Sequence, residues 1–166
     1  SADSPARILV IRPGGLGDMI LLLPALSAIA GRFPSAQLDV VCESRNMGVL
    51  ALSGLKVNCL PYDTEPARLL LHLVRTRFDI AVDSEQFHIF SAVFAGLSGA
   101  EARIGFNINP RRNGLYTHLI PYSPDGFEGA EFLRLLSPLG IQAGTFAPAN
   151  LKISDPRAVL KPELFD

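Results

Sequence analysis

Two kinds of hydrophobic pattern alternate along the chain. Short apolar runs rich in Val and Ile predict buried strands, and longer segments with apolar residues at helical spacing predict helices. The predicted strands cover residues 7–12, 37–42, 56–62, 78–84, 102–106 and 115–122. The predicted helices cover residues 16–33, 45–54, 65–77, 87–99 and 127–140. Strands separated by helices of this length predict a mainly parallel sheet with helices on both faces, which is a doubly wound, Rossmann-like α/β fold.

Two residues predict local features of these helices. Pro24 cannot donate a hydrogen bond to the carbonyl of Ile20, so we expect a bend or an irregularity in the helix over residues 16–33. Gly54 follows the apolar part of the next helix, at a position where a left-handed residue commonly ends a helix.

The loop between the first predicted strand and the first predicted helix is rich in glycine. It reads Arg12-Pro13-Gly14-Gly15-Leu16-Gly17-Asp18, and in a doubly wound sheet it lies at the carboxyl edge of the strands, where ligands bind. A glycine-rich turn there usually cradles a phosphate on backbone N–H groups. The Walker pattern needs a Lys and a hydroxyl residue after Gly17, and the dinucleotide fingerprint needs a third glycine where this chain has Ile20. The loop therefore carries no complete phosphate motif.

Asp18, which ends this loop, has two interpretations. An aspartate at the start of a helix is a common capping residue, and the positive end of the helix dipole favours a carboxylate there. Alternatively, the carboxylate faces the ligand cleft and acts as a general base. Gly14, Gly15 and Gly17 beside it would let a bulky substrate approach the backbone closely. The pattern alone leaves both interpretations open.

Composition narrows the class of protein. A chain of 166 residues is within the usual range of one domain. Its 15 basic and 16 acidic side chains give a formal charge of -1, so no overall field favours nucleic acid as a partner. Cys42 and Cys59 lack metal-ligand spacing and lie in apolar runs, so we expect both thiols to be buried, in a reducing cytoplasm. No cluster of His and carboxylate residues predicts a metal site.

The two ends of the sequence differ from its centre. Residues 1–5 do not combine a basic start with an apolar core, so they predict no signal peptide, and no apolar run predicts a membrane span. Residues 142–166 contain prolines and show little periodicity, which predicts a linker. We therefore expect a Rossmann-like domain over residues 1–141, followed by a linker toward a second domain outside this chain.

Several segments resemble one known family. The stretches "ILVIRPGGLGDMILLLPAL", "FDIAVDS", "RIGFN", "LYTHLIP" and "EFLRLLSPLGI" are similar to the N-terminal domain of the glycosyltransferase family 9 proteins, the bacterial heptosyltransferases of lipopolysaccharide synthesis. The resemblance runs from about residue 7 to about residue 141. It implies one half of a two-domain GT-B architecture, in which this half binds the acceptor saccharide. It also implies that Asp18 is the catalytic base of an inverting transfer, with Gly14, Gly15 and Gly17 beside the acceptor.

The resemblance implies partners as well. A glycan or glycolipid acceptor binds this half, and a nucleotide-sugar donor, typically ADP-heptose, binds the absent C-terminal half, with no metal ion and no other cofactor. We therefore expect this chain alone to be inactive, and the intact protein to work in the cytoplasm. Peripheral association with the inner membrane and the oligomeric state are left open. The alternative hypotheses are a non-catalytic domain and a nucleotide-binding Rossmann-like module.

The chain departs from the family pattern in two places. Where many members read Asp-Leu-Gln-Gly-Leu, residues 83–87 read Asp-Ser-Glu-Gln-Phe. Where members place a His and, three residues on, an Asp, this chain has Phe127 and Ala130. These departures leave the sugar and the acceptor open.

Arg111 and Arg112 form the best local candidate for anion binding. They lie in the turn-rich segment "NPRRNG" that follows the predicted strand over residues 102–106, at the ligand edge of the sheet. Loops at that edge often carry function, but charged turns are also common on any surface. The pair therefore predicts either a substrate-binding site or a solvent-exposed turn.

Overall fold

The computed structural model describes residues 5–142, which form one six-stranded sheet. The strands are β1 (Arg7–Ile11), β2 (Gln37–Cys42), β3 (Val57–Pro61), β4 (Ile80–Asp83), β5 (Ala102–Phe106) and β6 (His118–Ile120). All neighbouring strands pair in parallel, in the order β3-β2-β1-β4-β5-β6. The predicted Rossmann-like α/β fold is confirmed.

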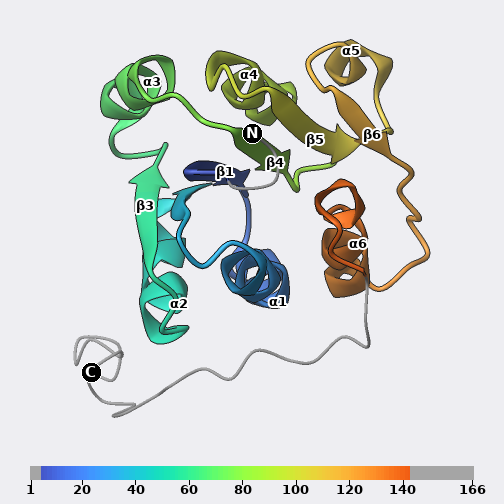
Figure 1. Cartoon of the computed structure of the whole chain (residues 1–166), viewed down its shortest axis with the longest axis horizontal. Coiled ribbons are helices and arrows are strands. Elements are labelled where there is room, and N and C mark those ends of the chain that lie inside the picture. The colour runs from blue at the N-terminus through green and yellow to red at the C-terminus, as the bar shows by residue number, and fades with distance from the viewer. Residues whose placement is uncertain (1–4, 143–166) are drawn as a thin grey trace, which may run out of the picture.

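Helices cover both faces of this sheet (Figure 1). They are α1 (Leu16–Arg32), α2 (Met47–Leu52), α3 (Pro66–Arg75), α4 (Ile89–Leu97), α5 (Pro110–Asn113) and α6 (Glu128–Arg134), with short 3-10 turns at Ser44–Asn46 and Ser137–Leu139. One core lies between the sheet and α1, α2 and α6, and a second core lies between the sheet and α3 and α4. The central strands β1, β2 and β4 are therefore buried on both faces, as their nearly continuous apolar sequences predict.

Some local predictions need correction. The helix α1 continues through Pro24 to Arg32, where Leu23 and Leu26 beside the proline are fully buried in the core, and a bend at Pro24 stays a prediction. The segment expected as a turn at "NPRRNG" forms the short helix α5, which Asn109 caps by accepting a hydrogen bond from the backbone N–H of Arg111. Gly54 has a φ of 70°, so the predicted left-handed helix end is confirmed.

The order of the strands creates a crevice. The strand β1 lies between β2 and β4, and the chain winds toward one edge of the sheet after β1 and toward the other edge after β4. The loops that leave the carboxyl ends of β1 and β4 therefore diverge, and such a switch point is where ligands bind in open α/β sheets. The glycine-rich loop lies at this point.

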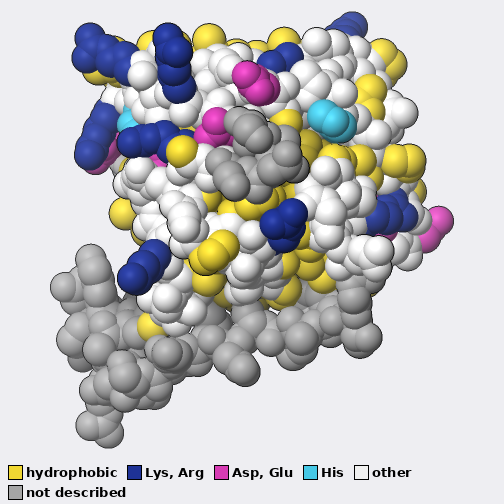
Figure 2. Space-filling view, viewed as in Figure 1, with side chains coloured by type: hydrophobic (Ala, Val, Ile, Leu, Met, Phe, Trp, Pro, Cys, Tyr) yellow, Lys and Arg dark blue, Asp and Glu magenta, His cyan; other side chains and the backbone are white. Residues whose placement is uncertain are grey.

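Charged side chains are distributed over the surface. On the face drawn in Figure 2, Lys and Arg side chains lie in several separate places, with Asp and Glu side chains among them. Within residues 5–142, no helix is both long and apolar enough to cross a membrane. The predicted linker over residues 142–166 lies, except for its first residue, outside the described residues.

Gly105 allows a close contact within the second core. The ring of Tyr116 packs on this residue of β5, and a Cβ added there would lie 2.5 Å from the ring carbon Cζ. We expect Gly105→Ala to lower the free energy of unfolding by about 1–3 kcal/mol, because the buried ring has to move. Urea denaturation would measure the change. A Cβ at Gly114 meets no atom within 4 Å, so Gly114→Ala is the matched control, with an expected change of less than about 0.5 kcal/mol. Equal stabilities of the two variants would contradict the prediction.

Candidate functional site

A cleft of about 490 Å³ opens at the switch point. Its walls come from the loop after β1, the loop after β4 and the segment that leads into α6. The residues that line it are Arg12, Pro13, Gly14, Gly15, Asp18, Glu85, Gln86, Phe87, His88, Tyr122 and Glu128. The cleft is within the usual size of small-molecule sites, and it contains the aspartate that the sequence singles out.

Asp18 lies in the first turn of α1, where its side chain is 39% exposed. The capping position belongs to Gly15, and no side chain forms a cap hydrogen bond at this end of the helix. Instead, Oδ2 of Asp18 lies 2.7 Å from Nη2 of Arg12. The structure therefore gives no support to a side-chain cap, and it leaves the carboxylate at the wall of the cleft.

Arg12 is the buried partner of this carboxylate. It follows β1 directly, and only 5% of its side chain is exposed. Its Nη1 donates to the backbone carbonyl of Ser84 at 2.7 Å and to Oε1 of Gln86 at 3.3 Å. The guanidinium also lies over the ring of Phe132, with its carbon 5.1 Å from the ring centre. Three elements of the fold therefore hold this cation in one place.

Gln86 and Glu128 continue the network across the floor of the cleft. The side-chain amide of Gln86 donates to Oε1 of Glu128, and the hydroxyl of Tyr122 donates to Oε2 of Glu128 at 2.9 Å. Burial raises the pKa of Tyr122 to about 12, and the nearby Glu128 carboxylate adds to the shift, so the hydroxyl stays protonated and remains a donor at neutral pH.

Glu85 shapes the loop between β4 and α4. Its Oε1 accepts hydrogen bonds from the backbone N–H groups of Gln86, Phe87 and His88, at 3.1, 2.9 and 3.4 Å. This carboxylate is buried, and it satisfies N–H groups that precede α4. Glu85 and Gln86, two of the residues that depart from the family pattern, therefore have structural partners in this chain.

The three glycines of the loop have different places. Gly14 and Gly15 line the cleft, whereas Gly17 is not among the lining residues. A Cβ at Gly14 would lie 3.4 Å from both Nη2 of Arg12 and Oδ2 of Asp18. A glycine at this position therefore leaves room for the ion pair.

Arg112 and Arg111 do not form the pair that the sequence suggested. Arg112 is fully buried, and its Nη2 lies 3.1 Å from Oδ2 of Asp83 and 2.8 Å from the hydroxyl of Tyr116. Burial prevents it from meeting a ligand in solution, so it acts as the counter-ion of Asp83. Arg111 is exposed on α5 and is not among the residues that line the cleft. A role of Arg111 in binding an anion stays a prediction.

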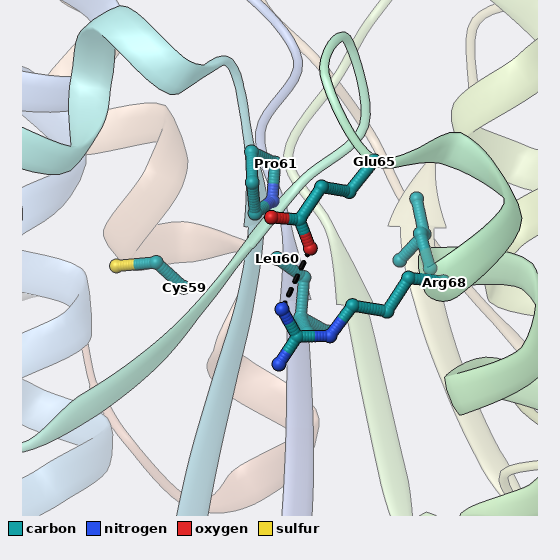
Figure 3. A pocket seen from close by; sticks show the side chains of 6 residues that line it. Cys59, Leu60, Pro61, Glu65 and Arg68 are labelled. Carbon is teal, nitrogen blue, oxygen red and sulfur yellow. Dashed lines mark hydrogen bonds and ion pairs between the residues drawn. The ribbon is translucent and has the colours of Figure 1, made fainter.

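A second hollow, at the end of β3 and the start of α3, is much smaller (Figure 3). Its volume is about 10 Å³, which is at the lower limit for one water molecule. Glu65 and Arg68 form an ion pair of 2.7 Å beside it. The thiol of Cys59 points away from this ion pair in the figure, and Cys59 is half-buried, whereas Cys42 is buried as predicted. No group of three or more His, Cys, Asp or Glu side chains within residues 5–142 could hold a metal ion.

Sequence reasoning did not assign most of the polar residues that surround Asp18. Arg12 carried a signal, since a charged residue directly after a buried strand usually needs a partner. The roles of Gln86 and Glu128 depend on a contact between distant segments, and neither has a local signature. The residues missed at the site are Arg12, Glu85, Gln86, Tyr122 and Glu128.

Comparison with known proteins finds one class of enzyme to which the chain is similar. No protein-family model matches the chain. The chain is 26% identical over 143 residues to lipopolysaccharide heptosyltransferase 3 of Escherichia coli, and the match covers 76% of this chain and 41% of that protein. The solved structure of E. coli heptosyltransferase WaaC with ADP has a TM-score of 0.71 and 18% identity, and covers 86% of this chain and 50% of its own. A glycosyl transferase family 9 protein from Veillonella parvula DSM 2008 has a TM-score of 0.72 and 15% identity, with 91% and 45% covered.

These similarities indicate the class of protein. The chain shares its Rossmann-like fold with solved heptosyltransferase structures, and it spans about half the length of the proteins it matches, or less. The chain is similar to bacterial heptosyltransferases and to a glycosyltransferase family 9 protein over part of their length, which confirms the resemblance seen in the sequence.

Proposed function

We propose that this chain is the acceptor-binding half of an inverting glycosyltransferase. The intact protein transfers a sugar, heptose from ADP-heptose, to a lipopolysaccharide core or a related glycan. One observation carries the proposal: a half-exposed carboxylate, Asp18, lies at the wall of a cleft of ligand size at the switch point of a fold shared with heptosyltransferases.

The chemistry requires one base on the acceptor side. Asp18 takes the proton from an acceptor hydroxyl while the hydroxyl oxygen attacks the anomeric carbon of the donor. The bond between the anomeric carbon and the phosphate oxygen breaks, and the nucleoside diphosphate leaves with the bonding electrons. Attack from the face opposite the leaving group inverts the anomeric centre. Holding both substrates in this geometry supplies much of the rate.

The donor has its place outside this chain. One relative was solved with ADP, in a protein of about twice the length of this chain. In our proposal the nucleotide sugar binds a second domain, which the linker over residues 142–166 connects to this one, and the reaction takes place between them. The proposal uses no metal ion and places the enzyme in the cytoplasm, where it meets a glycan or glycolipid acceptor.

Turnover tests this proposal. The complete gene product should release nucleoside diphosphate when it is given ADP-heptose and a deacylated lipopolysaccharide core, whereas the purified chain of residues 1–166 should fold and transfer no sugar. Release by the complete protein without acceptor is the control for hydrolysis of the donor. Transfer by the chain alone would contradict the division of roles. A complete protein that binds the acceptor without turnover would favour the non-catalytic alternative.

A further inference from the structure

The geometry around Arg12 points to a second role within the same site. We propose that Arg12 is the positioning residue of Asp18: it fixes the carboxylate in the orientation that the transfer requires, and Gln86 in turn fixes Arg12. The inference rests on the proposed function, because it assigns a task to the partner of the general base.

The first step of the argument is the geometry of the ion pair. Asp18 is half-exposed on the first turn of α1, where an aspartate without a partner can adopt several rotamers. Its Oδ2 is 2.7 Å from Nη2 of Arg12, a short distance typical of a charge-assisted hydrogen bond. This contact selects one rotamer of Asp18, and in our proposal the other carboxylate oxygen, Oδ1, accepts the proton of the acceptor hydroxyl.

The second step is the rigidity of the guanidinium. Its other terminal nitrogen, Nη1, is bound to the Ser84 carbonyl and the Gln86 side chain, and its face packs on Phe132. The planar guanidinium binds groups in fixed directions, which a lysine ammonium cannot reproduce. Only 5% of the Arg12 side chain is exposed. Arg12 is therefore suited to hold Asp18 and not to bind an acceptor itself.

The third step is the anchor beyond Arg12. Gln86 accepts from Arg12 through Oε1 and donates to Glu128 through its amide nitrogen, so its two polar atoms fix the orientation of the amide. Glu128 begins α6 and also accepts from the Tyr122 hydroxyl. The orientation of Asp18 is therefore determined by contacts that reach from β1 to α6.

Kinetics of the complete gene product test the inference. Arg12→Gln should lower kcat by about 10- to 100-fold, the scale of a small misplacement of reacting groups, with a change in acceptor KM of less than about threefold. Arg12→Lys should recover part of the loss because the ammonium still pairs with Asp18. Arg77→Gln removes an exposed arginine outside the cleft and is the matched control. Urea denaturation checks that each variant is folded.

A double-mutant cycle separates positioning from a general structural effect. If Arg12 acts through Asp18, then adding Arg12→Gln to Asp18→Asn should lower kcat by less than about threefold further, because the base is already absent. An undiminished effect in the Asp18→Asn background, or an unchanged kcat in folded Arg12→Gln, would overturn the inference and leave the proposed function intact. Absence of turnover in the unsubstituted protein would overturn both.

Discussion

The Asp18→Asn substitution is expected to lower the turnover of the complete protein by about a hundredfold or more, the scale of a lost general base. Asparagine has nearly the same size and shape as aspartate, and its carbonyl oxygen can still accept the hydrogen bond from Arg12. The amide cannot take a proton from an acceptor hydroxyl. The loss should therefore appear in kcat, with little change in the binding of either substrate or in the stability of the fold.

A matched control is available at the amino ends of the strands, whereas the cleft lies at their carboxyl ends. Glu101 is an exposed carboxylate just before β5, and Glu101→Gln removes the same charge without touching the cleft. The assay is release of nucleoside diphosphate with saturating donor and acceptor. Equal turnover of Asp18→Asn and Glu101→Gln would show that Asp18 is not the base, even though the fold is shared with heptosyltransferases.

The Arg112→Met substitution is expected to lower the free energy of unfolding by about 3–5 kcal/mol, the usual loss when one partner of a buried ion pair is removed. Arg112 and Asp83 are both fully buried. Without the guanidinium, the Asp83 carboxylate keeps a hydrogen bond from Tyr116 but loses its counter-ion, and the carbonyl of Glu85 loses its donor. Urea denaturation at neutral pH would measure the loss.

The pH dependence of this variant follows from the same carboxylate. Burial raises the pKa of Asp83, and Arg112 and the Tyr116 hydroxyl partly offset the shift. A carboxyl with a raised pKa binds its proton more tightly in the folded protein, so its contribution to stability falls as the pH rises above the unfolded value, about 3.9. The loss of unfolding free energy in Arg112→Met, relative to the unsubstituted protein, should therefore become smaller as the pH falls toward about 4.

A double variant tests the same explanation. Asp83→Asn combined with Arg112→Met should be more stable than Arg112→Met alone at neutral pH, and a lower stability of the double variant would contradict this explanation.

The fold was predictable because its signals are local. Apolar runs and helical spacing identified the strands of the sheet and its longer helices, and the alternation of the two predicted the parallel topology. The error at α5 also has a physical cause. An asparagine cap and a proline in the first turn convert an expected turn into a short helix there.

The site was only partly predictable because its partners come from distant segments. The position of Asp18 beside the cleft could be anticipated from the glycine-rich loop, since such loops lie at the carboxyl edge of the sheet. The burial of Arg112 could not be anticipated, because two arginines in a polar segment form the same local pattern whether or not a buried aspartate such as Asp83 lies close to them in the fold. The link from Arg12 through Gln86 to Glu128 likewise depends on how α6 packs beside α1.

The way the loop after β4 is fastened has a consequence for recognition. The carboxylate of Glu85 binds the backbone of residues 86–88 from inside, and the carbonyl of Glu85 accepts a hydrogen bond from the buried Arg112. A loop held from the core in this manner keeps its shape, so a ligand that fits the cleft poorly has to change its own conformation instead. This wall of the cleft is therefore rigid, and adjustment to a ligand has to come from parts of the molecule that are less firmly held.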